Sequence, residues 1–292
     1  MKYLPLVALL CWCGLANAAQ DPRLAAAIPG IEGQIHQSGA EVAVALRPRD
    51  GRSAWLLNAD ESFHAASTMK VPVLIELYHQ VSEGKLRLTD TLTVRNEFHS
   101  LVDGSVYQLD SSDDSEHELY GALGTTRTLA QLDELMVTVS SNLATNLLIE
   151  RLGVRNIRAG VHALGADGMQ VLRGVEDEKA FRQGLNNTTT ARALLTLMEA
   201  IATGRAVDAR SSHEMVEVLE RQTFNERIPA GLPPGTRVAH KTGEITKIAH
   251  DAAIVFAPRP FVLVILTRGI ESPADSATLM ADITRTLYQA TQ

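Results

Sequence analysis

The stretch that decides the fold lies near the end of the chain and reads Arg237-Val-Ala-His-Lys-Thr-Gly243, Ala252-Ala-Ile-Val-Phe256 and Phe261-Val-Leu-Val-Ile-Leu266. These runs are rich in apolar and β-branched residues, which predicts three strands. Ala257-Pro-Arg-Pro260 supplies turn residues between the last two, so they form a hairpin. An amphipathic helix over 274–289 is expected to close the chain.

The other end of the chain contributes a second pair of strands. Residues 41–46 and 53–57 read as a hairpin around Asp50-Gly51, preceded by a helical pattern over 21–37. Helical patterns dominate between the two ends and are clearest at 71–81, 129–152, 157–164, 188–202 and 211–221.

This order predicts an α/β (α+β) fold in which both chain ends build one sheet around a helical insertion. We expect a five-stranded antiparallel sheet flanked by the N- and C-terminal helices, plus an all-helical domain. The sheet domain would comprise 19–66 and 205–292 and the helical domain 67–204, with the active site at their interface.

One long connection stands out among the predicted helices. The segment 96–126 is polar, carries an acidic run from Asp110 to Glu118, and is long for a loop without secondary structure. A functional lid and a disordered loop are equally compatible with this pattern. Tyr107 within it fits the rim of a site or a cover over the core, and we favour the core.

The N-terminus reads as a signal peptide over 1–18. Lys2 gives a positive start, an apolar run follows, and Ala16-Asn17-Ala18 offers small residues for cleavage. Both cysteines, Cys11 and Cys13, lie in this segment, so the mature chain is expected to have no disulfide. We expect a periplasmic or secreted bacterial protein with no membrane anchor after cleavage.

Composition excludes several functional classes. A formal net charge of −7 argues against a nucleic-acid partner, because a protein that binds nucleic acid needs a basic face. The nine histidines form no His-x-His or His-Glu-x-x-His pattern, so no metal site is predicted. No glycine-rich phosphate loop follows a predicted strand, so no cofactor is expected. Nothing demands more than a monomer.

Three short motifs can carry chemistry. Ser67-Thr-Met-Lys70 puts a hydroxyl and an amine on one helix face, where a desolvated lysine can activate a serine. Lys241-Thr-Gly243 can hold a carboxylate, and its glycine in a strand allows close approach of a ligand. Ser140-Ser-Asn142 interrupts a helical region. Taken singly, these motifs also fit a helix cap, a surface lysine before a turn, and a second helix cap.

Together and in this order, the motifs resemble those of class A serine β-lactamases within the penicillin-recognising superfamily. The resemblance covers most of the chain after the signal peptide and includes Ser140-Ser-Asn-Leu-Ala-Thr-Asn146. It implies that Ser67 is the acylated nucleophile, that Lys70 transfers its proton, and that Ser140 relays a proton to the leaving nitrogen.

The resemblance also implies a set of substrate-binding residues. Asn142 would hold the amide side chain of the substrate, and Lys241 and Thr242 its carboxylate. The backbone N–H groups of Ser67 and Glu244 would form the oxyanion hole. The residues implied to bind substrate are Asn142, Lys241, Thr242, Gly243 and Glu244.

The deacylating glutamate is where the sequence departs most from the family. Class A enzymes carry it in a Glu-x-x-Leu-Asn motif, whereas this chain reads Leu172-Arg-Gly-Val-Glu-Asp-Glu-Lys-Ala-Phe181. Glu176 is the expected base, with Asp177 and Glu178 as rivals. All three also fit solvated loop charges.

Further departures concern the substrate pocket. Ser141 stands where the family usually has aspartate, which removes a structural charge. Glu244 replaces a small residue, and its carboxylate would repel anionic substrates unless it points to solvent. His250 occupies a place where many members have a carboxylate-binding arginine, and Arg227 is the alternative source of a guanidinium.

The predicted function is hydrolysis of a small-molecule β-lactam through an acyl-enzyme on Ser67, followed by deacylation by water. The first alternative uses the same nucleophile as a D-Ala-D-Ala peptidase, a transpeptidase or an esterase-like hydrolase. A working base at Glu176 separates the two. The second alternative is a non-catalytic, secreted binding module, which would need no activated nucleophile.

Overall fold

The structure, a computed structural model, describes residues 21–50 and 54–292. The signal peptide expected at 1–18 lies outside the described residues, as does part of the first hairpin turn. Among the helices of the described part, none combines the length and apolar character needed to cross a bilayer.

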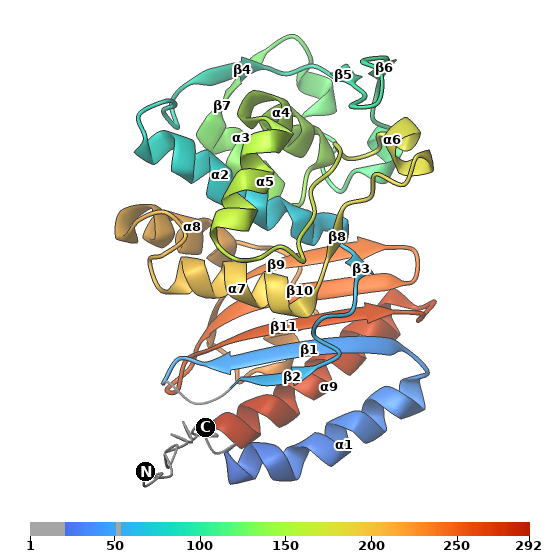
Figure 1. The fold of residues 1–292 in the computed structure, drawn as a ribbon, viewed down its shortest axis with the longest axis vertical. Helices are drawn as coiled ribbons and strands as arrows, with labels where there is room; N and C mark the ends of the chain where they lie inside the picture. Colours follow the sequence, from blue (N-terminus) through green and yellow to red (C-terminus); the bar gives the residue numbers. More distant parts are fainter. Residues whose placement is uncertain (1–20, 51–53) are drawn as a thin grey trace, which may run out of the picture.

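The centre of the fold is the five-stranded antiparallel sheet expected from the sequence, in the order β2-β1-β11-β10-β9 (Figure 1). Strand β11 is buried along almost its whole length because both faces of the sheet are covered. Strand β9 forms one edge of the sheet. The strands are β1 (Glu41–Pro48), β2 (Trp55–Leu57), β9 (Arg237–Ile245), β10 (Ile248–Phe256) and β11 (Phe261–Arg268).

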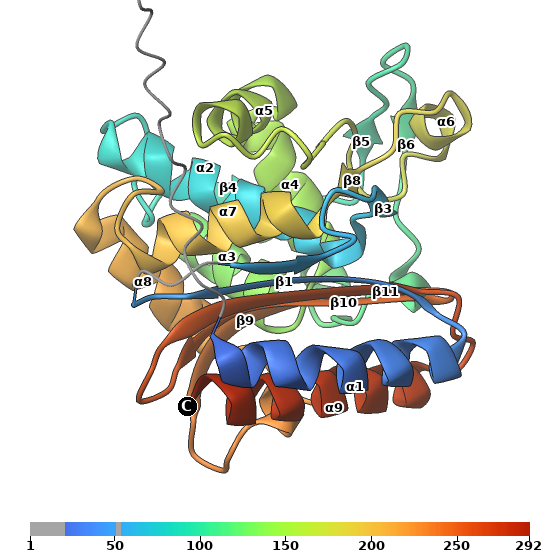
Figure 2. The ribbon, with the colours of Figure 1, turned by 60° about the horizontal axis from the view of Figure 1, so that its bottom comes forward.

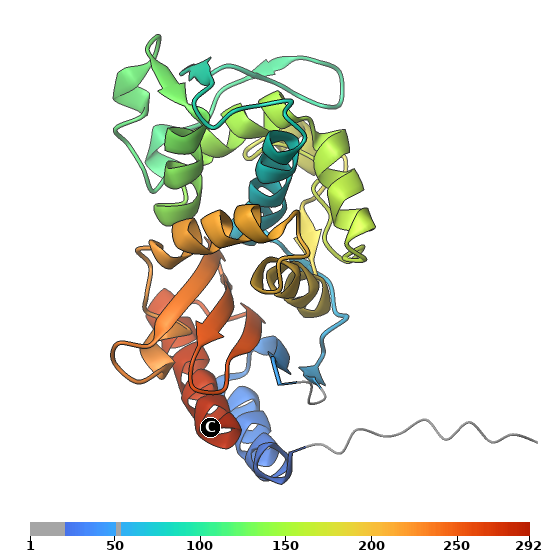
Figure 3. The same cartoon turned by 90° about the vertical axis from the view of Figure 1, so that its left-hand side faces the viewer.

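Two helices from opposite ends of the chain, α1 (Pro22–Ser38) and α9 (Pro273–Thr291), lie side by side on one face of the sheet (Figure 2). Ile31 of α1 and Ile283 of α9 pack with Ile265 of β11 in one core cluster. The two terminal helices predicted from the spacing of apolar residues are therefore present, and Figure 3 shows this layer beneath the sheet from the side.

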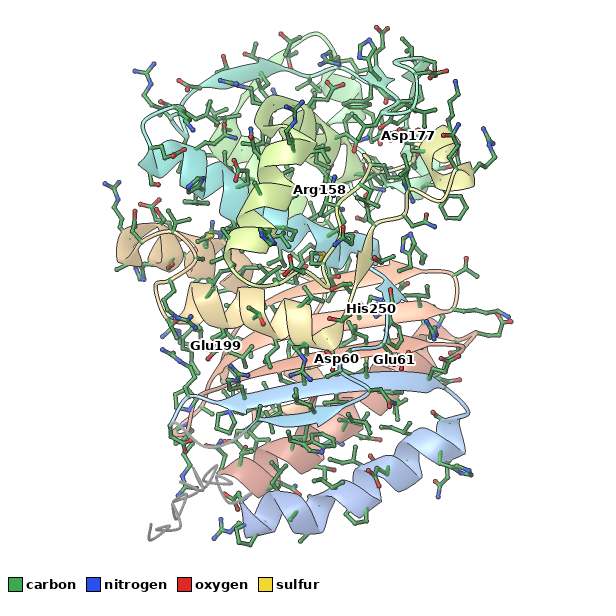
Figure 4. The ribbon with its side chains drawn as sticks, viewed as in Figure 1. Asp60, Glu61, Arg158, Asp177, Glu199 and His250 are labelled. Carbon is green, nitrogen blue, oxygen red and sulfur yellow. The ribbon has the colours of Figure 1, made fainter. Side chains whose placement is uncertain are left out.

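The opposite face carries α7 (Ala191–Ala202), whose apolar stripe joins a core that continues into the other helices. Arg47 of β1 forms an ion pair at 2.7 Å with Glu199 of α7, and Glu199 is labelled in Figure 4. The expectation that this helix begins at residue 188 is wrong. Residues 188–189 form β8 (Thr188–Thr189) and pair with β3 (Phe63–His64), in keeping with the preference of threonine for strands.

The remaining helices form a layer above α7. The helical pattern over 129–152 is interrupted at Ser140-Ser-Asn142, as the sequence indicated. It forms α3 and α4, which are separated at Ser140, whose φ is +60°. Ser141 caps α4 by accepting a hydrogen bond from Ala144 N at 3.2 Å. The helices of this layer are α2 (Lys70–Ser82), α3 (Leu129–Thr138), α4 (Asn142–Leu152), α5 (Val154–Ala163), α6 (Glu178–Arg182) and α8 (Ala209–Glu220).

The long segment 96–126 is folded against this layer, so the disordered alternative does not hold. Asn96 exchanges two hydrogen bonds of 2.8 Å with the backbone of Leu109, which closes the segment into a compact loop. Tyr107 packs against Phe98 and the core, as favoured from the sequence. The segment contains β5 (Phe98–His99), β6 (Val106–Tyr107) and two 3₁₀ turns (Ser111–Asp113 and Tyr120–Ala122), and it ends at the start of β7 (Thr126–Thr128), which pairs with β4 (Thr91–Thr93).

Candidate active site

Ser67 lies at the start of a helix and faces a pocket. It belongs to a 3₁₀ turn (Ala66–Met69) that continues directly into α2, so its backbone N–H is at the positive end of the helix. Ala66, just before it, has a φ of +45°, a left-handed conformation that is unfavourable for alanine. Such strain is common where a fold must present a reactive group.

Lys70 follows one turn later and is almost completely buried. Its Nζ donates to Ser140 O at 2.6 Å, to Ser140 Oγ at 3.1 Å and to Asn142 Oδ1 at 3.0 Å. Burial lowers the pKa of this amine to about 7, while Asp114 and Glu176 oppose the shift. The lowered pKa favours the neutral form of the Lys70 amine, which is able to accept a proton.

Ser140 connects the two motif lysines. Its Oγ accepts hydrogen bonds from Lys70 Nζ at 3.1 Å and from Lys241 Nζ at 3.0 Å, which leaves its own O–H free to donate. Burial and the charge of Lys70 hold the pKa of Lys241 well below its usual range. A hydroxyl between two amines with lowered pKa values is suited to pass a proton.

These groups meet at a pocket of about 720 Å³. Strand β9 forms one wall, and Gly243 in it comes very close to the start of α2. A Cβ on Gly243 would lie 3.1 Å from Ser67 N and 3.0 Å from Thr68 N, so a side chain would push the strand away. Of the predicted site residues, those that line the pocket are Ser67, Ser140, Asn142, Thr242, Gly243 and Glu244.

Glu176 lies beside this pocket rather than in its lining. Its Oε2 accepts a hydrogen bond from Asp110 N at 2.9 Å, and its Oε1 a longer one from Asn142 Nδ2 at 3.4 Å. Burial raises the pKa of Glu176, and nearby Asp113 adds to the effect. Asn142 thus bridges Lys70 and Glu176 through its two amide atoms.

The loop that carries Glu176 is held by Asn146 of α4. Asn146 Oδ1 accepts from Val175 N at 2.7 Å, and its Nδ2 donates to Val175 O at 2.9 Å. Gly174 packs so closely that a Cβ there would lie 2.4 Å from the Tyr107 hydroxyl. The φ of Glu176 is +60°, so the chain turns sharply at the carboxylate.

The two rival acids have other surroundings. Asp177 is buried at the start of α6 (Figure 4), where it accepts hydrogen bonds from Ser100 Oγ at 2.9 Å and Ala180 N at 3.0 Å. Glu178 is exposed in the first turn of α6. Of the three acids, Glu176 is the one that contacts Asn142 and so reaches the predicted site.

Of the two residues considered for binding the substrate carboxylate, Arg227 lines the pocket and His250 does not. Arg227 donates to His250 O at 3.0 Å and pairs with the carboxylate of Glu244. His250 is buried between β10 and β3, with its Nε2 at 2.8 Å from His64 O (Figure 4). Burial lowers its pKa to about 4, so its ring is neutral at physiological pH.

A residue that sequence reasoning missed is Asp114. Its buried Oδ2 accepts hydrogen bonds from Asn142 N at 2.8 Å, Leu143 N at 2.9 Å and the Tyr120 hydroxyl at 3.1 Å. The carboxylate therefore caps α4 from a distant segment, beside the serine that replaces the usual aspartate. Its place in an acidic run gave no signal of this role.

This arrangement fits the family whose model matches the chain. The model describes the β-lactamase enzyme family, and the match covers residues 23–291. The chain belongs to this family. The extended-spectrum β-lactamase PER-1 of Pseudomonas aeruginosa is 25% identical over 285 residues, which cover 94% of this chain and 89% of that protein.

Solved structures agree with this assignment. A variant of PBP-A, solved as an acyl-enzyme complex with penicillin G, is 26% identical, with a TM-score of 0.78 over 93% of this chain and 98% of that one. An ancestral class A β-lactamase shares the fold, at 24% identity and a TM-score of 0.78 over 90% of this chain and 99% of its own. The resemblance to class A serine β-lactamases is confirmed, and the chain is a divergent member.

Membership makes the protein a hydrolase of the β-lactamase type and supports serine β-lactam hydrolysis. The expected fold and enzyme class are thus confirmed at the level of the family.

Proposed function

We propose that this protein hydrolyses β-lactams with Ser67 as nucleophile, Lys70 as proton acceptor and Glu176 as deacylating base. The observation that carries the proposal is the continuous contact from Lys70 through Ser140 to Lys241, in which Ser140 lines the same pocket as Ser67. A merely structural cluster would not need two buried amines that share one hydroxyl, because burying a charged amine is costly.

In the acylation step, Ser67 Oγ attacks the lactam carbonyl carbon, the Oγ–C bond forms, and the ring C–N bond breaks. The serine proton passes to Lys70 Nζ, Ser140 delivers its hydroxyl proton to the leaving nitrogen, and Lys70 passes a proton to Ser140 Oγ, so that both groups return to their starting state. The N–H groups of Ser67 and Glu244 stabilise the oxyanion. Water then attacks the ester and gives a proton to Glu176, which returns it to Ser67 as the product leaves.

Substrate binding uses the same walls of the pocket. Lys241 and Thr242 hold the carboxylate, Gly243 lets the substrate lie along the edge of β9, and Asn142 holds the amide side chain. Arg227 adds a guanidinium on the side of the pocket that faces α9. We further propose that the mature chain acts as a monomer in the periplasm or outside the cell and confers antibiotic resistance. Its site would lie between the sheet domain and the helical domain.

Time-resolved intact-protein mass spectrometry with a penicillin and, separately, a cephalosporin tests this proposal. We expect a drug-sized adduct that maps to the peptide containing Ser67, forms and then clears, while hydrolysed drug accumulates. An adduct that persists would indicate a peptidase-like protein without an effective deacylating base. No adduct with either drug would contradict the proposal and favour ester or peptide substrates, or a binding module.

Glu244 gives a prediction about affinity. Its carboxylate pairs with Arg227 and is half-exposed, so a substrate carboxylate must compete with it. Glu244→Thr should lower KM for a penicillin by about two- to fivefold with kcat little changed, and added salt should reduce the difference. Glu271→Gln, which removes a rim carboxylate paired with Lys247 instead, is the matched control. A KM that rises or stays constant in Glu244→Thr would show that Glu244 does not oppose binding.

A further inference from the structure

The segment 96–126 is joined to the Glu176 loop by several polar contacts. Buried Asp177 accepts hydrogen bonds from Ser100 Oγ at 2.9 Å and from Leu101 N at 3.2 Å. On the surface, Lys179 Nζ binds Asp103 Oδ2 at 2.9 Å. The two stretches are far apart in sequence, yet they form one unit beside the active site.

Within this unit, the carboxylate of Glu176 has one short hydrogen bond, from the backbone N–H of Asp110 at 2.9 Å. The contact from Asn142 is 3.4 Å, which is too long to hold the group firmly. In the family motif Glu-x-x-Leu-Asn, an asparagine stands four residues after the glutamate. In this chain Ala180 stands at that position, and its side chain has no hydrogen-bond donor for the carboxylate of Glu176. A backbone donor is well suited to this task because it does not rotate away.

We propose that the backbone N–H of Asp110 is the positioning group that orients Glu176 for deacylation, which makes the segment 96–126 part of the catalytic machinery. The inference rests on the proposed role of Glu176 as deacylating base. A carboxylate held through one oxygen keeps the other directed toward Asn142 and the pocket. Without this N–H donor, the Glu176 side chain would be free to rotate. The loss of the hydrogen bond would also favour the protonated form of the carboxyl group.

The electrostatic surroundings of Glu176 come from three elements. The segment 96–126 contributes acids and phenols, α2 contributes an amine, and α4 contributes a neutral amide. The titratable groups that interact with Glu176 are Lys70, Asp113, Asp114, Tyr107 and Tyr120. None of them donates a hydrogen bond to Glu176 within the described residues, so the Asp110 N–H has no substitute among them.

The test compares Asp110→Pro, which removes the N–H, with Asp110→Ala, which keeps it and removes only the side chain. The backbone of Asp110, with φ −86° and ψ 120°, is close to what proline adopts. We expect Asp110→Pro to deacylate about 10- to 100-fold more slowly than Asp110→Ala, with similar acylation. The acid limb of its deacylation profile should move to higher pH. Equal deacylation rates and equal profiles would overturn the inference.

Two further measurements keep the result interpretable. In a Glu176→Gln background, Asp110→Pro should have no additional effect on deacylation, because the carboxylate that the Asp110 N–H positions is already gone. If Asp110→Pro does not fold, hydrogen exchange in the natural chain decides. The Asp110 amide should be protected and lose that protection in Glu176→Ala, and an unprotected amide would overturn the inference. If Glu176→Gln itself turns over normally, the proposed base is wrong, a result distinct from failure of this inference alone.

Discussion

Glu176→Gln should trap the acyl-enzyme: turnover of a penicillin is expected to fall by about 10²- to 10⁴-fold while acylation of Ser67 continues. The carboxamide has nearly the same shape and can still accept the Asp110 N–H, so the loop should keep its structure. What it loses is the ability to take a proton from water. Burst kinetics and intact-protein mass spectrometry would show one equivalent of adduct that clears slowly.

The matched control is Glu178→Gln, which neutralises the exposed acid two residues later and should turn over normally. Glu176→Gln combined with Ser67→Ala should acquire no adduct. Normal turnover in Glu176→Gln would remove Glu176 from the mechanism, and trapping in Glu178→Gln would assign the base to the neighbour.

The pH dependence of deacylation follows from the same carboxylate. Burial raises the pKa of Glu176, so its protonated, inactive form persists to higher pH than for an exposed glutamate. Deacylation should therefore fail as pH is lowered through this raised pKa. In Glu176→Gln this acid limb should disappear.

The sequence was sufficient to predict the sheet because strand signals depend on local composition. The apolar runs at 252–256 and 261–266 lie in β10 and β11. Because successive side chains of a strand point to opposite faces of the sheet, these runs supply residues to both core clusters. Where prediction failed, non-local pairing decided the structure. Thr188 and Thr189 joined β3 instead of a helix.

In the candidate site, too, residues in local motifs were predictable, whereas residues that act through contacts distant in sequence were not. Ser67, Lys70 and Lys241 stand in motifs, so their residue types and order sufficed to single them out. Asp114 and the Asp110 N–H act across 28 and 66 positions of sequence on Asn142 and Glu176, and no local pattern encodes such contacts. The choice between Arg227 and His250 required the structure, because both residues are buried and only Arg227 lines the pocket.

Lys70→Met should have the second large effect, a loss of acylation by about 10²- to 10⁴-fold. Methionine has a similar length and suits the buried site, but it has no amine to accept the proton of Ser67. Acylation is best measured in Glu176→Gln, where deacylation is blocked and Glu176 is no longer an alternative base. Stopped-flow traces across neutral pH then report on Lys70 directly.

The pKa of about 7 sets the sign of the pH dependence: acylation should rise with pH through this value as Lys70 becomes neutral. The charge of Glu176 raises this pKa, so the midpoint in Glu176→Gln should lie below that of the natural chain. Lys247→Met, which removes an exposed lysine at the pocket rim, is the control and should keep the midpoint. An unchanged acylation rate and midpoint in Lys70→Met would assign the serine proton to another acceptor.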